Sequence, residues 1–341
     1  MASAQNIEVL TTVPFPEEVM EQLRSLSPRI KVTLNPASKV EEIPREIWQR
    51  TEVLYTDILL PDLDLVPNLK WMQFHYAGID FIQGSDLLTR KELKFTSMSG
   101  ASAIQEGEYI LMMMLALGHQ MRGLMKNQEQ AAWPADRWEK FSPRELSNST
   151  VGLVGYGSIG REVARLLQPF NVTVLAAKRE VMHPEDTGYT VEGHGDPDGN
   201  YFHRLYPIEA LGSMLKECDF VVVTLPLTPR TRGIIGEDEF KVMKNSAYLI
   251  HVSRGGIVNE DALLQALTEK RIAGAAVDVF TSEPLPPEHP LWKAPRLIIT
   301  PHVSGFSQSY KERAGVMFAE NLKRYMRAEP LMNEYSPERH Y

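Results

Sequence analysis

The chain has 341 residues, 43% hydrophobic and 23% charged, with a formal net charge of −8. This length and composition are typical of a folded protein of two domains. The acidic balance argues against a nucleic-acid partner, which usually requires a basic patch. The single cysteine, Cys218, excludes an intramolecular disulfide and fits a reducing compartment.

Neither a membrane partner nor export is expected. The first residues lack a charged segment followed by an apolar run, which is the pattern of a signal peptide. The most apolar stretch, residues 109–117, is too short to span a bilayer. We therefore expect a cytoplasmic protein.

Short apolar runs alternate with helical patterns along the chain, first as a series in residues 1–118 and again from residue 150. The expected strands are residues 7–11, 31–34, 53–55, 71–75, 151–154, 172–176, 220–224, 247–252, 275–279 and 297–300. The expected helices are residues 17–26, 106–130, 158–167, 208–216, 260–269 and 309–327. Alternating strands and helices predict parallel sheets covered on both faces.

The fold class expected is therefore α/β, with two Rossmann-like or flavodoxin-like parallel-sheet domains and a cleft between them. The long helical pattern at 106–130 is a natural connector. We expect a substrate-binding domain from residues 1–118 plus 307–341. Residues 119–306 are expected to form a dinucleotide-binding Rossmann domain.

A glycine-rich turn follows the strand expected at 151–154 and opens a helix. It reads Gly155-Tyr156-Gly157-Ser158-Ile159-Gly160. The first glycine suits a tight turn, the second lets a pyrophosphate approach the backbone, and the third allows close packing of helix on strand. The helix N-terminus attracts phosphate groups. These six residues are expected to bind a dinucleotide.

The end of the next strand bears on the choice of cofactor. An NAD site usually has an acidic residue there, which binds the ribose 2′-hydroxyl. This strand ends in Lys178 and Arg179 instead. Two cations suit the 2′-phosphate of NADP, so NADP is the cofactor expected and use of NAD stays open. The alternative is that both are solvated loop charges.

Three further side chains come directly after expected strands: Arg254, Glu283 and His302. The carboxyl ends of parallel strands share one edge of a sheet, where ligands bind. An arginine can bind the carboxylate of a substrate through two hydrogen bonds. A histidine can transfer a proton while the carboxylate of a neighbouring side chain orients its ring. Beside a dinucleotide site, this set predicts a keto-acid reductase.

The chain resembles the D-isomer-specific 2-hydroxyacid dehydrogenases over nearly its whole length. The run from Glu283-Pro284-Leu285-Pro286 to His289-Pro290-Leu291-Trp292 is similar to the glyoxylate/hydroxypyruvate reductase branch. The other matching signatures are Tyr76-Ala77-Gly78-Ile79-Asp80, Gly107-Glu108-Tyr109, residues 155–160, Val252-Ser253-Arg254-Gly255-Gly256, Val277-Asp278-Val279-Phe280 and Pro301-His302.

The resemblance implies roles for matching positions. Arg254 would bind the substrate carboxylate and polarise the carbonyl, His302 would be the acid/base, and Glu283 its partner. Backbone amides around Tyr76, Ala77 and Gly78 would help to hold the substrate. Arg254 and His302 would also contact the cofactor, as would Pro226, Thr231, Val252, Ser253, Asp278 and Gly305. The family also implies a homodimer, formed through the cofactor domain and the helix at 106–130.

Two features depart from the family pattern. Lys178 stands where NAD-type members carry Asp, and the connection at 180–207 is unusually long. That connection contains Asp196-x-Asp198-x-Asn200, which lacks the glycine and terminal glutamate of an EF-hand. We expect a solvent-exposed or interface loop there, and no metal site.

The function expected is reduction of a small 2-keto acid to the D-2-hydroxy acid by an NADPH-preferring enzyme. Glyoxylate and hydroxypyruvate are the first candidates, and phenylpyruvate or a branched keto acid the second. The alternative is a non-catalytic, dinucleotide-sensing interaction protein, similar to the C-terminal-binding corepressors on the same fold. Turnover of 2-keto acids with NADPH separates the two.

Overall fold

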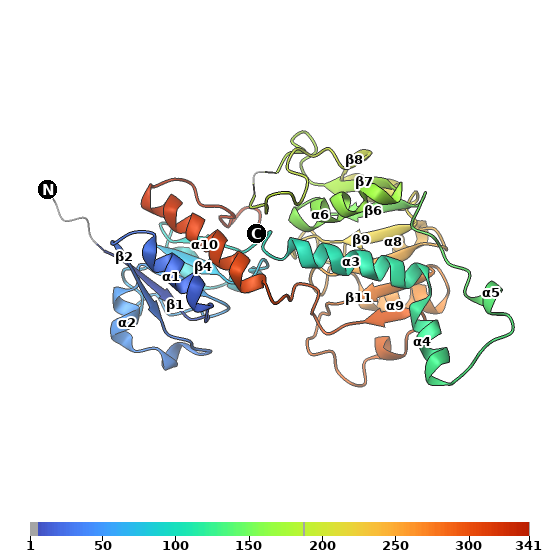
Figure 1. Ribbon diagram of the computed structural model, residues 1–341, viewed down its shortest axis with the longest axis horizontal. Coiled ribbons are helices and arrows are strands. Elements are labelled where there is room, and N and C mark those ends of the chain that lie inside the picture. Colours follow the sequence, from blue (N-terminus) through green and yellow to red (C-terminus); the bar gives the residue numbers. More distant parts are fainter. Residues whose placement is uncertain (1–5, 187, 341) are drawn as a thin grey trace. The chain divides into compact units, whose positions relative to one another are not determined.

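The computed structural model describes residues 6–186 and 188–340, and the chain divides into two compact units (Figure 1). Unit 1 comprises Met1–Ser102 and Ser307–Tyr341, and unit 2 comprises Ala103–Phe306. The first border therefore lies after Ser102 and not after residue 118. The reason is packing: α3 (Ala103–Gly118) buries Ile110 and Met114 in the core of unit 2.

Unit 1 is a five-stranded sheet in the order β2-β1-β3-β4-β5, with every pair parallel. Every residue of β3 and β4 is buried, as expected for strands of a parallel sheet covered on both faces. The strands are β1 (Ile7–Thr11), β2 (Ile30–Leu34), β3 (Val53–Thr56), β4 (Trp71–Phe74) and β5 (Lys94–Thr96).

The helices of unit 1 are α1 (Glu17–Ser25), α2 (Arg45–Arg50) and α10 (Tyr310–Met326), with short 3-10 turns at Val40–Glu42, Asp80–Ile82 and Asp86–Thr89. In α1, Val19, Met20 and Leu23 have helical spacing and form its buried face. Helix α10 packs on α1, so the last segment of the chain completes the first unit.

Unit 2 is a seven-stranded parallel sheet in the order β12-β11-β10-β9-β6-β7-β8. The strands are β6 (Thr150–Val154), β7 (Thr173–Lys178), β8 (Arg204–Pro207), β9 (Phe220–Val223), β10 (Tyr248–His251), β11 (Gly274–Val277) and β12 (Leu297–Ile299). The chain order reverses between β6 and β9, and a dinucleotide binds outside the carboxyl ends of strands at such a switch point.

Most helices of unit 2 cover one face or the other of this sheet. Besides α3, the helices are α4 (Met121–Glu129), α5 (Arg137–Lys140), α6 (Ser158–Leu167), α7 (Leu211–Leu215), α8 (Glu237–Val242) and α9 (Glu260–Thr268), with 3-10 turns at Gln168–Phe170, Ile208–Ala210 and Pro290–Lys293. No helix of the described ranges is long and apolar enough to cross a membrane. The expected class, two parallel-sheet α/β domains, is confirmed.

One expectation within unit 2 is wrong, and another holds only in part. The helix expected at 106–130 is two helices, because Gln120 adopts a left-handed conformation (φ 54°) between α3 and α4. The connection at 180–207 is not simply an exposed loop: its last residues form β8, and Gly195 and Asp196 are buried. Their burial follows from contacts with α6, described below.

Candidate active site

The glycine turn lies at the switch point of unit 2, between β6 and α6. Gly155 has φ +110°, a conformation that other residues rarely adopt. A Cβ added at Gly160 would clash with the carbonyl oxygen of Gly155, so only glycine lets the helix approach the turn so closely. At Gly157 an added Cβ would meet nothing within 4 Å, which leaves room beside the backbone. The turn therefore fits a pyrophosphate at the N-terminus of α6.

The neighbouring strand ends supply the other residues expected near a cofactor. Lys178 is the last residue of β7, and its Nζ donates to the carbonyl oxygen of His183 at 2.8 Å. After β9, the hydroxyl of Thr231 donates to the carbonyl oxygen of Pro226 at 2.6 Å and accepts from the Thr228 amide at 2.8 Å. These bonds give the loop beyond β9 a fixed shape. Val252 and Ser253 are buried directly after β10.

His302 and Glu283 form a hydrogen-bonded pair in unit 2. Nδ1 of His302 lies 2.6 Å from Oε2 of Glu283, and the other carboxylate oxygen accepts from the Phe280 amide at 2.8 Å. Because a carboxylate accepts hydrogen bonds, Nδ1 donates and Nε2 is the nitrogen left for chemistry. His302 has a left-handed backbone (φ 54°), and its amide donates to the carbonyl oxygen of Asp278 at 2.9 Å.

Asp278 holds the loop that carries His302. Its side chain is fully buried, and Oδ1 accepts from the hydroxyl of Thr300 at 2.6 Å and the amide of Val303 at 3.0 Å. Oδ2 accepts from the amide of Ser304 at 2.9 Å. The carboxylate thus has three donors from residues on both sides of His302. Its observed contacts are with this loop, and they make Asp278 a positioning residue for the histidine.

Arg254 lies in the turn after β10, where Nη1 donates to the carbonyl oxygen of Ser253 at 2.9 Å. The next residue, Gly255, lies so close to Phe280 that an added Cβ would clash with the carbonyl group of Phe280. Because the amide of Phe280 binds Glu283, this contact brings the arginine turn against the segment that orients His302.

Two residues of α3 support the same loop, and sequence reasoning did not assign them. The hydroxyl of Tyr109 lies 2.5 Å from Oγ1 of Thr300, and the side chain of Gln105 donates to the carbonyl oxygen of Gly305. Burial raises the pKa of the Tyr109 phenol to about 12, so it stays protonated at neutral pH. The signature Gly107-Glu108-Tyr109 contained the tyrosine without giving it a role, and Thr300 at the end of an expected strand was a second signal.

The loop Tyr76-Ala77-Gly78 lies just past the carboxyl end of β4 in unit 1. The carbonyl oxygen of Tyr76 accepts from the Met98 amide at 3.0 Å. Within residues 6–186 and 188–340, the amides of Ala77 and Gly78 donate no hydrogen bond, which leaves two donors for an anion. His75, also missed from the sequence, is buried beneath this loop.

His75 is held neutral by its surroundings. The hydroxyl of Tyr55 lies 2.6 Å from its Nδ1, and Tyr310 donates to its carbonyl oxygen at 2.5 Å. Burial, reinforced by the charge of Lys311, lowers the pKa of the His75 imidazole to about 4. The ring therefore supports the loop as a packed, uncharged group.

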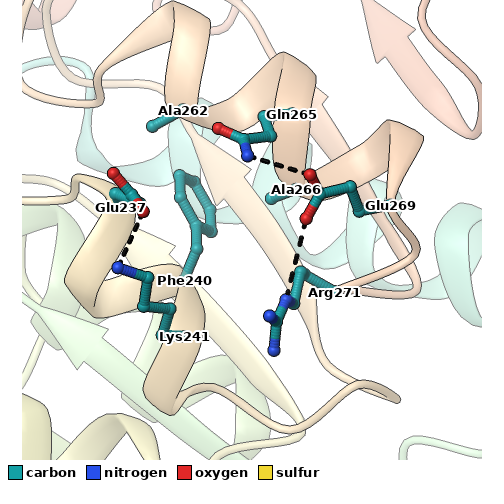
Figure 2. Close-up of a pocket in the computed structure, with 8 residues that line it drawn as sticks. All are labelled: Glu237, Phe240, Lys241, Ala262, Gln265, Ala266, Glu269 and Arg271. Carbon is teal, nitrogen blue, oxygen red and sulfur yellow. Dashed lines mark hydrogen bonds and ion pairs between the residues drawn. The ribbon is translucent and has the colours of Figure 1, made fainter.

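A recess on the surface of unit 2 is lined by residues of α8 and α9 and the turn that follows α9 (Figure 2). Its charged and polar groups pair with one another: Lys241 with Glu237 at 2.7 Å, and Glu269 with Gln265 at 2.9 Å and Arg271 at 3.9 Å. It contains none of the residues expected in the active site.

Comparison with known proteins connects this geometry to a family. Residues 111–304 match the family model described as "D-isomer specific 2-hydroxyacid dehydrogenase, NAD binding domain". A glyoxylate reductase of Thermofilum pendens is 31% identical over 294 residues, which are 85% of this chain and 82% of that protein.

Solved structures with a similar fold match nearly the whole length of the chain. A D-isomer-specific 2-hydroxyacid dehydrogenase from Xanthobacter autotrophicus Py2, in complex with NADPH and MES, is 26% identical with a TM-score of 0.79, covering 99% of this chain and 100% of that one. An NADPH-dependent glyoxylate/hydroxypyruvate reductase from Sinorhizobium meliloti, in complex with NADP and sulfate, is 25% identical with a TM-score of 0.75, covering 98% and 100%.

Proposed function

Because the chain belongs to the D-isomer-specific 2-hydroxyacid dehydrogenases, which are NAD(P)-dependent oxidoreductases, we propose that it reduces a small 2-keto acid to the D-2-hydroxy acid with NADPH. The observation that carries this proposal is the pair formed by His302 and Glu283 in the unit that contains the glycine turn. A nicotinamide bound there would supply the hydride for C2 of the keto acid.

The protein's own residues do the rest of the chemistry. Arg254 binds the carboxylate and polarises the neighbouring carbonyl through its planar guanidinium. Nε2 of His302 gives a proton to the carbonyl oxygen, which becomes the hydroxyl of the product. Glu283 fixes the ring by holding Nδ1, and Asp278 fixes the loop. The free amides of Ala77 and Gly78 suit a carboxylate oxygen, so we assign them to the substrate.

Loss of NADPH absorbance with a panel of 2-keto acids tests the activity, in wild type and in His302→Ala. We expect kcat to fall by roughly 10²–10⁴-fold in the variant, with NADPH affinity little changed, because the general acid is removed. Near-normal turnover would remove His302 from the mechanism. Tight NADPH binding without turnover of any keto acid would favour the dinucleotide-sensing alternative.

Glyoxylate and hydroxypyruvate are the substrates we favour, since relatives with these activities in their names match most of the chain. Both have the carboxylate-plus-carbonyl head that Arg254 can hold in a fork. The panel therefore includes phenylpyruvate and a branched keto acid. A higher kcat/KM for either of these would overturn the choice.

NADPH is the cofactor we favour because β7 ends in Lys178, followed by Arg179. A charge-assisted hydrogen bond to a phosphate contributes about 1.5–3 kcal/mol, so even one bond gives roughly tenfold selectivity. We expect kcat/KM for NADPH to exceed that for NADH by more than about tenfold, and the gap to shrink in Lys178→Ala/Arg179→Ala. If the ratio of kcat/KM for NADPH to that for NADH is unchanged in the double variant, neither cation determines the cofactor preference.

We further propose a homodimer formed through the cofactor unit. The segment from α3 to α5 carries large apolar side chains that unit 2 leaves exposed, and such patches mark interaction surfaces. They are Met112, Met121, Leu124, Met125, Trp133 and Trp138, between 39% and 85% exposed. A second copy of the chain would bury them.

A cytoplasmic location is also part of the proposal. The lone thiol, Cys218, is buried, and burial raises its pKa to about 12, which suits an unreactive packing residue in a reducing compartment. Fractionation of cells that express the protein would test this.

A further inference from the structure

The connection between β7 and β8 contains an insert, residues 180–186 and 188–203, that folds back on the glycine turn and on α6. It brings buried polar groups together, which is costly unless they are paired. Arg161 and Glu162 of α6 are only 2% and 1% exposed, and Asp196 of the insert is 2% exposed. These three residues form its anchor.

Arg161 joins two segments of the insert to the first turn of α6. Its Nη1 donates to the carbonyl oxygen of Asp196 at 2.5 Å, and its Nη2 donates to that of Pro184. Its Nε lies 3.5 Å from a carboxylate oxygen of Asp186, and its guanidinium lies 4.7 Å from the ring centre of Tyr156. One side chain therefore clamps two segments that are distant within the insert.

Asp196 ties the insert to the glycine turn itself. Its Oδ2 accepts from the hydroxyl of Tyr156 at 2.5 Å and from the amide of Tyr201 at 3.0 Å, and its Oδ1 accepts from the amide of Asn200 at 2.8 Å. Tyr156 stands between the first two glycines of the turn. This contact is made by the Tyr156 side chain and not by the backbone expected to bind the pyrophosphate.

Glu162 adds a third tie. It accepts from the amide of Gly195 at 2.7 Å and lies 3.0 Å from Nδ1 of His194, while Arg165 neutralises it at 2.6 Å. The Glu162 carboxylate is therefore paired within this cluster, and these contacts hold the insert against α6. The insert is therefore attached to α6 and to the glycine turn by several buried hydrogen bonds.

The insert also holds Lys178. The ammonium group of Lys178 donates one hydrogen bond to the carbonyl oxygen of His183, at 2.8 Å. Its other two N–H groups can donate to a ligand. The nearby carboxylates of the insert have partners of their own, since Glu185 pairs with His183 at 3.1 Å and Asp186 with Arg161. A long, flexible lysine loses entropy when it binds a phosphate, and a prior clamp reduces that loss.

We propose that the insert is a cofactor-selectivity element: anchored by Arg161, Glu162 and Asp196, it holds the Lys178 ammonium at the end of β7 for the 2′-phosphate of NADPH. This inference rests on the proposed dinucleotide site. The preference for NADPH over NADH then depends on two things: the Lys178 cation at the end of β7, and the anchor in the insert and α6 that holds this cation in place.

Equilibrium binding of NADPH and NADH, followed by cofactor fluorescence, tests the inference without turnover. Asp196→Asn should weaken the anchor because an amide can accept at only one of the two positions. We expect the Kd for NADPH to rise about tenfold, the loss of roughly one charge-assisted bond, and the Kd for NADH to change less than about twofold. Asp198→Asn, an exposed carboxylate of the same insert, is the matched control.

A double-mutant cycle then asks whether the anchor acts through Lys178. In Lys178→Ala/Asp196→Asn the loss of NADPH affinity should equal that of Lys178→Ala alone, because the second substitution has no ammonium left to misplace. Additive losses would overturn the inference. So would equal weakening of NADPH and NADH by Asp196→Asn, which is what a purely structural role predicts.

Tyr156→Phe provides a second route if Asp196→Asn does not fold, since it removes only the hydroxyl and keeps the ring against Arg161. The same cofactor ratio is measured. Failure of the cofactor proposal would appear in wild type, as equal Kd values for NADPH and NADH. Failure of the inference would appear as a ratio that neither anchor variant changes.

Discussion

Replacing Asp278 with asparagine should loosen the loop that carries the proposed proton donor. Three donors converge on this buried carboxylate, two on Oδ1 and one on Oδ2. An asparagine can keep its oxygen toward Thr300 and Val303, but its NH₂ then faces the amide of Ser304, donor against donor. The loss is one charge-assisted bond, with a buried amide left unsatisfied.

Each of those two effects is worth about 1–3 kcal/mol, so the variant should lose at least about 2 kcal/mol of stability. For a unit of roughly 200 residues this lowers Tm by about 4–8 °C. The loop should also misplace His302, and kcat should fall by roughly 10–10²-fold.

Calorimetry and steady-state kinetics measure these effects, with Asp198→Asn as an exposed control and Thr300→Ser as a variant that keeps the hydroxyl. Both should behave like wild type. A Tm within about 1 °C of wild type for Asp278→Asn, or an unchanged kcat, would refute the assignment of Asp278 as the residue that positions His302, since the bond energies imply otherwise.

Three further outcomes are expected. Arg254→Lys should raise KM and lower kcat together, because an ammonium cannot reproduce the guanidinium fork, whereas a change confined to the Kd of NADPH would assign Arg254 to the cofactor. The free energy of unfolding should fall as the pH is lowered from about 6.5 to 4, because the unfolded chain protonates His75 in this range while the buried ring of the folded protein stays neutral. In His75→Gln, on the order of 3 kcal/mol of this loss should disappear. A pH profile of Tm that is the same in the variant and in wild type would contradict this expectation. Light scattering at micromolar protein should show a dimer and Met125→Glu should shift it towards monomer, while a wild-type monomer would exclude the proposed interface.

The sequence by itself determined those features of the candidate site that depend on neighbouring residues or on the general architecture of a parallel sheet. A glycine turn between an apolar run and a helical pattern is complete within about a dozen positions, and it lies between β6 and α6 as expected. Arg254, Glu283 and His302 could be placed at one sheet edge because a parallel sheet gathers the carboxyl ends of its strands there.

Only the tertiary structure decided which residues support those side chains. The bond from Thr300 to Asp278 joins residues 22 positions apart, and the contact between Tyr109 and Thr300 joins residues 191 apart, so no local pattern predicts either. The membership of α3 in unit 2 and the folding of the insert over α6 have the same cause. Both arrangements depend on which surfaces of distant segments pack together in the folded protein, and a local sequence pattern does not contain this information.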